Sequence, residues 1–276
     1  MVNGVISEFV NSNSKVDILL FFILLCFIFV IVLRLLIYIT VTYAGVSDSP
    51  ILINGTVSGN DMRVFEQDPS VRGSTPIKRS TNEDGISFTW STWLNIDGPG
   101  TIQGHQYVTD QHIFHKGNNE IDPITGVNIP HNAPGLYLSP NNELVVYMNT
   151  FDSIDGNKVV VGNIPRGKWF NVIIRVSEQY TLDVYINGKL VKRHILSGIP
   201  KQNYDNVYVG LNNGFSGSIS SLRYYPRAIS NIDILNLIRD GPNLKRITVD
   251  NSNIFNKGEQ YLSLQWFLSS HSPDYL

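Results

Sequence analysis

The most prominent pattern in the chain is an unbroken run of apolar residues near its N-terminus. Residues 18–33 read ILLFFILLCFIFVIVL, and after Arg34 the run continues as LLIYITVTYA. About 20 residues at 1.5 Å each cover the roughly 30 Å hydrocarbon core of a bilayer, whereas a helix in a soluble core shows a polar face. Residues 18–40 are therefore predicted to form a transmembrane helix in the lipid bilayer, between a short tail (1–17) and a linker (41–50).

A cleaved signal peptide is the alternative for this segment, because Thr42 and Ala44 suit a cleavage site. The apolar run is longer than the roughly 7–15 residues of a signal peptide's apolar region, and the residues before it are not clearly basic. A retained helix is therefore favoured. Its orientation stays open, because Lys15 on one side is offset by Glu8 and Asp17.

Beyond residue 50 the chain changes to short stretches in which apolar and polar residues alternate, as in strands with one buried face. In residues 86–97 the apolar positions are Ile86, Phe88, Trp90, Leu94 and Ile96, and Trp93, which breaks the polar face, is expected to be covered by another segment. Further strands are predicted at residues 135–138, 144–148, 169–176, 182–186, 207–209 and 219–224. Such spacing, with Asn, Gly, Pro and Asp turns between strands, predicts an all-β antiparallel sandwich or jelly roll.

One hairpin and one helix are predicted inside this β region. Asn187-Gly188 supplies the two positive φ angles of a type I′ turn. A helix is expected over residues 231–239, capped by Ser230, stopped by Gly241-Pro242, and apolar on the face of Ile232, Leu235 and Ile238.

The β domain is predicted to occupy residues 51–242, followed by an extension at 243–276. The extension ends in YLSLQWFLSS, where alternation at residues 262–268 predicts a late strand or a segment that docks on the sandwich.

Composition narrows the class of protein. The single cysteine, Cys26, lies in the apolar run, so the β region forms no internal disulfide. A formal net charge of −2 without a block of Lys or Arg argues against a nucleic-acid partner. Alanine occurs only at residues 44, 133 and 228, a bias expected from an AT-rich genome such as that of a protist or a large DNA virus.

Four segments together resemble a known family. They are ISFTWSTWLNID (86–97), HIFHKG (112–117), IPRGKWFNVIIRV with LDVYINGKLV (164–191), and VYVGLNNGFSGSISSLRYYPRAIS (207–230). In this order they resemble the laminin-G-like branch of the concanavalin A-like lectin/glucanase superfamily, and more closely its membrane-anchored versions from large DNA viruses and some protists. The resemblance implies a two-sheet jelly roll that binds a glycan or a protein or has a structural role.

Catalytic residues of the related glycosidases are not recognised. Those enzymes need a pair of carboxyl groups flanking the bond to be broken. The nearest match is Glu120-Ile121-Asp122, but residues 124 and 125 are Ile and Thr, and the surroundings predict a loop. Glu120 and Asp122 are interpreted as solvated loop carboxylates, and the chain is predicted not to be an enzyme.

A metal site is not predicted from the histidines. His105, His112 and His115 lie near Asp110, but in an extended strand His112 and His115 point to opposite faces, being an odd number of residues apart.

The resemblance leaves a calcium ion open, because many laminin-G-like domains hold one through Asp or Asn side chains and backbone carbonyls. Residues of that type are Asp110, Asn118, Asp122, Asn212 and Asn213. No spacing identifies them as ligands, and each equally suits a turn.

The binding surface is predicted on residues 98–134 together with the turn at 212–215, because loops that long are usually functional. The candidate contact residues are Tyr107, Asp110, Asn118, Asn119, Asp122, Asn212, Asn213 and Phe215. A loop without a ligand is the alternative. Replacing residues 118–132 by a Gly/Ser linker is expected to leave the unfolding midpoint nearly unchanged but to abolish retention of the domain by its native membrane or particle.

Aromatic residues divide into two expected groups. Trp90 and Trp169 lie in strand patterns and are expected in the core. Phe151, Tyr107, Tyr204 and Phe215 lie in or near turns, where an exposed ring could stack on a sugar or anchor a partner, and the sequence does not tell which of them are exposed.

The leading hypothesis is a membrane-tethered, non-enzymatic binding or structural protein that contacts proteins or glycans, as a component of a virion. A cell-surface or endomembrane adhesion lectin is the first alternative, for which Asn54, in the sequon Asn54-Gly55-Thr56, would be the glycosylated residue. A degenerate glycoside hydrolase is the second.

Overall fold

The computed structural model describes residues 15–44, 49–71, 73–80, 86–97, 101–102, 105–106, 109–152, 157–177 and 180–247. Helix α2 (Lys15–Ala44) belongs to one unit, and the β strands belong to another, Ser47–Asn253. The two units are described separately.

Helix α2 contains a stretch, Ile18–Ile39, that is long and apolar enough to cross a membrane. None of that stretch is buried against the rest of the chain, and its Leu, Ile and Phe side chains are exposed. A helix that is apolar on every side is not stable in water and requires an apolar environment. A membrane anchor and a signal sequence share these properties, so both interpretations of the segment stand.

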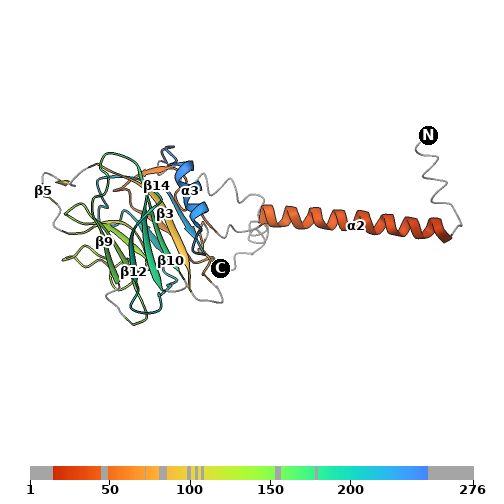
Figure 1. The fold of residues 1–276 in the computed structure, drawn as a ribbon, viewed down its shortest axis with the longest axis horizontal. Coiled ribbons are helices and arrows are strands. Elements are labelled where there is room, and N and C mark those ends of the chain that lie inside the picture. Colours follow the sequence, from red (N-terminus) through yellow and green to blue (C-terminus); the bar gives the residue numbers. More distant parts are fainter. Residues whose placement is uncertain are drawn as a thin grey trace, which may run out of the picture. The chain divides into compact units, whose positions relative to one another are not determined.

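The second unit consists of two six-stranded antiparallel sheets (Figure 1). Sheet A runs in the order β1 (Thr56–Ser58), β14 (Gly217–Tyr225), β3 (Phe88–Ile96), β10 (Phe170–Ser177), β11 (Thr181–Ile186), β12 (Lys189–Ile195). Sheet B runs in the order β2 (Arg63–Phe65), β13 (Val207–Val209), β6 (Gln111–Lys116), β7 (Gly135–Leu138), β8 (Leu144–Met148), β9 (Asn157–Val161). A short hairpin joins β4 (Thr101–Ile102) to β5 (His105–Gln106). The predicted all-β, jelly-roll-like sandwich is confirmed.

The main core fills the space between the sheets. Alternate residues of β3, including Phe88, Trp90 and Leu94, belong to one buried cluster with Phe114 and Leu136 of sheet B. Period-two alternation aims every second side chain of each strand at the opposite sheet. This is the arrangement that the sequence pattern predicted for the inward faces.

The outer face of β3 differs from the prediction, because it is buried as well. Thr89 donates a hydrogen bond from its hydroxyl to the Arg227 carbonyl, at 2.9 Å, and accepts one from the Ile229 amide, at 3.2 Å. Trp93 is covered, as expected. Polar residues on this strand therefore bind a second layer of chain instead of facing water.

Helix α3 (Asn231–Asp240) is part of that second layer, and its start is confirmed. The Ser230 side chain accepts from the Asp233 amide, and the Asp233 carboxylate accepts from the Ser230 amide, which forms a capping box. The predicted buried face was wrong. Ile234 packs in a cluster beneath the helix, whereas Ile232 and Leu235 are 71% and 66% exposed.

The hairpin between β11 and β12 is confirmed. Asn187 and Gly188 have φ angles of 49° and 78°, and Ile186 pairs with Lys189. Trp169, which was expected in the core, lies just before strand β10. Phe170 is fully buried at the start of β10, and Trp169, the preceding residue, is only half-buried because neighbouring residues of a strand face opposite sides.

The start of the C-terminal extension lies along strand β1. The Thr56 amide donates to the Lys245 carbonyl at 2.7 Å, and the Ile247 amide donates to the Thr56 carbonyl at 2.9 Å. The strand predicted at residues 262–268 lies outside the described residues.

Candidate binding site

A cavity of about 630 Å³ opens where both sheets meet three loops. Sheet A contributes Phe88, Trp90 and Tyr224, and sheet B contributes Lys116 and Tyr208. The loops contribute residues 67–69 and 77–79, 117–119, and 202–206. The volume is in the range of roughly 300–1,000 Å³ that is typical of small-molecule sites.

Aromatic rings form the apolar part of the cavity. The rings of Trp90 and Tyr224 have centroids 5.1 Å apart, and Phe88 stacks on Tyr224 at 6.4 Å. Phe114 supports Trp90 from sheet B at 5.3 Å. Because these rings pack against one another, their positions are set by the core before any ligand binds.

The loop after β2 is fixed against the loop before β13. The Gln67 amide donates to the Asn206 side-chain carbonyl at 3.0 Å, and the Asn206 amide group donates to the Glu66 carboxylate at 2.7 Å. The side-chain carbonyl of Gln67 accepts from the Ile77 amide at 2.9 Å, which closes the loop on itself. This wall of the cavity is therefore held by partly buried hydrogen bonds.

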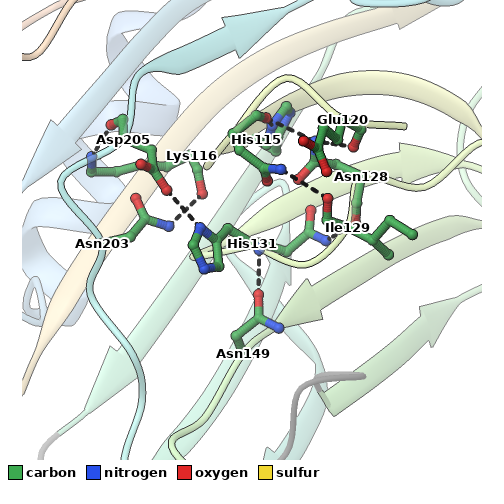
Figure 2. A network of polar contacts seen from close by, with 11 residues as sticks. His115, Lys116, Glu120, Asn128, Ile129, His131, Asn149, Asn203 and Asp205 are labelled. Atoms are coloured by element: carbon green, nitrogen blue, oxygen red, sulfur yellow. Dashed lines mark hydrogen bonds and ion pairs between the residues drawn. The ribbon is translucent and has the colours of Figure 1, made fainter. Parts of the chain in front are cut away.

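Another part of the lining belongs to a polar network around Lys116 and Asp205 (Figure 2). The Lys116 amine donates to the Asp205 carbonyl at 2.5 Å, and Asn203 donates to the Lys116 carbonyl at 3.0 Å. The Asp205 carboxylate lies 2.8 Å from Nδ1 of His131. Burial lowers the pKa of the Lys116 amine to about 8, and the negative charge of Asp205 opposes this shift.

Several polar side-chain atoms of the lining are buried without a hydrogen-bond partner among the described residues. They are Nε1 of Trp90 and the carbonyl oxygens of Asn118, Gln202 and Asn203. A buried polar atom without a partner costs about 1–3 kcal/mol. These atoms have almost no accessible surface, so a ligand in the cavity reaches them only after a side-chain movement.

Tyr204 and Arg79 form the rim. Arg79 donates to the Tyr204 hydroxyl at 2.7 Å, and its guanidinium carbon lies 5.6 Å from the ring centre. Tyr204 is 77% exposed. Phe151 is exposed too, but it is not part of the lining.

The structure places two of the eight predicted contact residues, Asn118 and Asn119, in the cavity wall. Asp110 precedes β6. Burial raises the pKa of its carboxyl, and the charge of Lys158 opposes this shift. Asn212 and Asn213 are exposed in the turn after β13, with φ angles of 52° and 64°. Asp110, Asn212 and Asn213 therefore lie apart from the cavity lining.

Phe215, a candidate contact residue, is buried. It is 1% exposed and belongs to the main core, against the backbone of Gly59, so its ring is closed to a ligand. Tyr107 lies outside the described residues.

Residues 118–132 form an ordered layer on the outer face of sheet B. Asn128 and Asn132 are buried, and both bind the hydroxyl of Tyr137: the Asn128 amide donates to it at 3.1 Å, and it donates to Asn132 at 2.6 Å. Asn128 also donates to the Glu120 carbonyl, at 2.5 Å. These buried contacts lead us to expect that the segment contributes to stability, contrary to the expectation from the sequence.

Two histidines lie beneath that layer, and the expectation that they point to opposite faces of the strand was wrong. Nε2 of His112 lies 2.6 Å from Nδ1 of His115, so the two rings point toward each other. The register of β6 against β7 shifts between His112 and Phe114, and this bulge puts both side chains on one face. A strict period of two fails at a bulge.

The acidic pair Glu120 and Asp122 lies in a turn outside the cavity lining. Both oxygens of the Asp122 carboxylate are used locally, by the Ile124 amide at 3.0 Å and the Thr125 hydroxyl at 2.7 Å. Within the described part of the chain, no group of three His, Cys, Asp or Glu side chains converges. This arrangement gives no support to a calcium ion at Asp122.

Asn54 is exposed, and its side-chain carbonyl accepts a hydrogen bond from Asn243 at 3.1 Å. Its glycosylation stays a prediction.

Pattern reasoning missed Lys116, Arg79, Gln202 and Tyr208 as lining residues. The usable signal was the polar segment KQNYDN at 201–206, which interrupts two strand patterns and carries three amide side chains.

Comparison with known proteins gives a family. Residues 72–235 match a laminin G family model described as the concanavalin A-like lectin/glucanases superfamily. Similar solved structures include the receptor binding domain of botulinum neurotoxin D, at 11% identity and a TM-score of 0.48, covering 70% of this chain and 47% of that chain. Another is the Ruminococcus gnavus IT-sialidase CBM40 bound to alpha2,3 sialyllactose, at 12% identity and a TM-score of 0.47, covering 67% of this chain and 97% of that chain. The chain spans less than half of the length of the neurotoxin D domain. None of the curated proteins compared matches the chain.

Proposed function

Because the chain belongs to the concanavalin A-like lectin/glucanases superfamily, we propose that its sandwich is a non-enzymatic binding domain, anchored to a membrane by α2, whose cavity receives a hydroxyl-rich ligand such as the end of a glycan. The observation that carries this proposal is a cavity of about 630 Å³ whose lining joins amide side chains, including Asn118 and Gln202, to the exposed ring of Tyr204 at the rim. Sugar hydroxyls exchange hydrogen bonds with amide groups, and the apolar face of a sugar ring packs on aromatic rings.

The carboxylates of the cavity support binding without hydrolysis. Among the described lining residues these are Asp68 and Asp205. Asp205 pairs with His131, and hydrogen bonds from Ser70 lower the pKa of the Asp68 carboxyl. A glycosidase needs one carboxyl with a raised pKa as its general acid. The shift at Asp68 is in the opposite direction.

A binding experiment with a matched pair of variants tests the proposal. The full chain in lipid nanodiscs is applied to an immobilised glycan array, and Gln202→Met is expected to lose retention because it removes an amide group from the cavity lining. Gln111→Met is the control, since Gln111 also has a buried, unpaired carbonyl among the described residues but lies outside the lining. Retention of no glycan, or release of reducing ends from the bound ones, would refute the proposal.

The proposed location is the membrane of a virus particle. It is supported by the resemblance to virus-encoded, membrane-anchored domains and by the AT-rich bias of the composition. Mass spectrometry of purified particles and of host membranes tests it, and a protein found only in host membranes would contradict it.

An adhesion lectin at the cell surface is the second candidate, favoured by the exposure of Asn54 in its sequon. A glycan on Asn54 of the native protein, detected by a mass shift on enzymatic deglycosylation, would favour this candidate.

A further inference from the structure

A chain of hydrogen bonds crosses β6 and joins the turn after β13 to the cavity wall. The Leu211 amide donates to Nδ1 of His112 at 3.0 Å. Nε2 of His112 lies 2.6 Å from Nδ1 of His115, and Nε2 of His115 lies 2.7 Å from the Asn118 carbonyl. Both rings are buried. Every imidazole nitrogen of the pair therefore has a partner.

The partners fix the tautomer of each ring. Nδ1 of His112 accepts from an amide, so the proton of the neutral ring is on Nε2, which donates to His115. Nδ1 of His115 is then an acceptor, and its Nε2–H donates to the Asn118 carbonyl. The bonds point in one direction, from Leu211 to Asn118, and both histidines are neutral.

An added proton is incompatible with this chain. On His112 it would sit on Nδ1 and face the Leu211 N–H, and on His115 it would sit on Nδ1 and face the Nε2–H of His112. In each case two donors meet and a bond is lost. Protonation of either ring therefore separates one end of the chain from the other.

The groups packed around the pair favour the neutral form. Tyr137 of β7 lies edge-on to His112 at 5.4 Å, and Tyr208 of β13 stacks on His115 at 5.2 Å. Burial lowers the pKa of His112 well below its usual value, and the neighbouring His115 adds to this. Burial also lowers the pKa of His115 to about 4, opposed by the bond to Asn118 and by the charge of Asp205.

We propose that His112 and His115 are positioning residues that hold the Asn118 wall of the cavity in place at neutral pH and release it, together with the Leu211 turn, in acid. The effect on ligand binding rests on the proposed function, because Asn118 and Asn119 line the cavity and Asn118 carries one of the unpaired acceptors. We call this chain of hydrogen bonds, Leu211–His112–His115–Asn118, the relay. It connects residues 118–119 with the turn at 212–213, and the sequence predicted that both belong to one binding surface.

The size of the acid response follows from linkage. In the released state each histidine titrates with the ordinary pKa of about 6.5. Below that pH, each histidine raises the ratio of released to closed molecules by up to about tenfold per pH unit.

Hydrogen exchange measured by mass spectrometry tests the relay without a ligand. The full chain in nanodiscs is exchanged at several pH values between 7 and 5, and rates are corrected for the intrinsic pH dependence. Peptides covering residues 117–132 and 210–216 are expected to exchange about tenfold or more faster at pH 5.5 than at pH 7, while peptides from β10 stay unchanged. The glutamine in His115→Gln can still accept from His112 and donate to Asn118, but it does not titrate. The increase in exchange rate on acidification should therefore be smaller in this variant, by about tenfold per pH unit. His194→Gln is the control, because His194 lies on β12 and binds Asn157.

Exchange that is independent of pH in both segments, or faster in one segment alone, would overturn the relay. Equal loss of the response in His194→Gln would overturn it too. The pH series on the unmodified chain decides the matter even where a variant fails to fold. Because no ligand is present, a failure to find glycan binding refutes the proposed function and leaves this result interpretable.

Discussion

Arg79 donates a hydrogen bond of 2.7 Å to the hydroxyl of Tyr204, from a different loop, at the rim of the cavity. The guanidinium also lies over the face of the same ring. The bond ties together two loops that are 125 residues apart in the chain. It holds an exposed aromatic ring in a fixed place, where a ligand can reach it without first ordering the side chain.

Tyr204→Ala is expected to weaken ligand retention by about tenfold, or about 1.4 kcal/mol, because it removes the exposed ring of the rim. The unfolding midpoint should stay nearly the same, since the ring is 77% exposed. Titration of the array ligand against the variant measures the effect. Phe151→Ala is the control, with a ring that is 61% exposed and outside the cavity lining. Equal losses in both variants would show that the effect is not specific to the rim.

Deleting residues 1–44 should give a soluble, folded, β-rich domain. The two sheets and α3 all lie beyond residue 55, and their core is continuous without α2. Circular dichroism and cooperative unfolding by urea measure the outcome. Non-cooperative unfolding of the product would contradict it. N-terminal sequencing of the mature protein addresses the signal-peptide alternative, which would be supported by a chain beginning at residue 45.

Trp90→Ala should destabilise the fold by about 3–5 kcal/mol, the usual cost of removing a large core ring. Trp90 is 1% exposed and contacts Phe114 and Tyr224. Trp169→Ala should cost about 1 kcal/mol, because its ring is half-buried. Urea denaturation of both variants provides the comparison. Equal costs would mean that Trp169 has a packing role that its exposure does not show.

Local patterns were sufficient to predict much of the fold. Strands β7, β8 and β13 begin and end at the predicted residues, and the Asn187-Gly188 turn and the Ser230 cap are where they were expected. These features depend on neighbours in sequence, either the alternation of one strand or the backbone preference of one turn.

The cavity could not be predicted in this way, because its residues meet only through tertiary structure. Lys116, Gln202 and Arg79 come from three separate segments, and no spacing in the sequence brings them together. The errors at His112 and Phe215 have a related origin. A bulge changed the facing of His112, and a turn residue, Phe215, was drawn into the core beside Gly59.

Replacing residues 118–132 by a Gly/Ser linker should now lower the free energy of unfolding by several kcal/mol. The replacement leaves Tyr137 without Asn128 and Asn132, and each lost buried partner costs about 1–3 kcal/mol. The double variant Asn212→Ser/Asn213→Ser, in an exposed turn, is the control and should change the unfolding midpoint little. A linker variant as stable as the unmodified chain would show that this layer does not support the sheet.

Acid should destabilise the fold in a pH range that identifies the two buried histidines. Burial holds the pKa of His112 and of His115 below the usual value, to about 4 for His115, so the folded state favours the neutral rings. The unfolded chain binds their protons near pH 6.5. Stability is therefore complete above about pH 6.5 and is lost as the pH falls toward 4, by up to about 1.4 kcal/mol per pH unit for each histidine.

The carboxylates of Asp122 and Asp233 act in a different range from the two histidines. The pKa of Asp122 and of Asp233 is lowered by hydrogen bonds, so their contributions are lost only below the ordinary carboxyl pKa of about 4. Urea midpoints of the full chain at pH 7 and at pH 5 should thus differ by a few kcal/mol in the free energy of unfolding. The double variant His112→Gln/His115→Gln should lose most of that difference, whereas His194→Gln should keep it. A double variant that is as acid-sensitive as the unmodified chain would mean that other groups control the response, and the relay between Leu211 and Asn118 would then have no part in it.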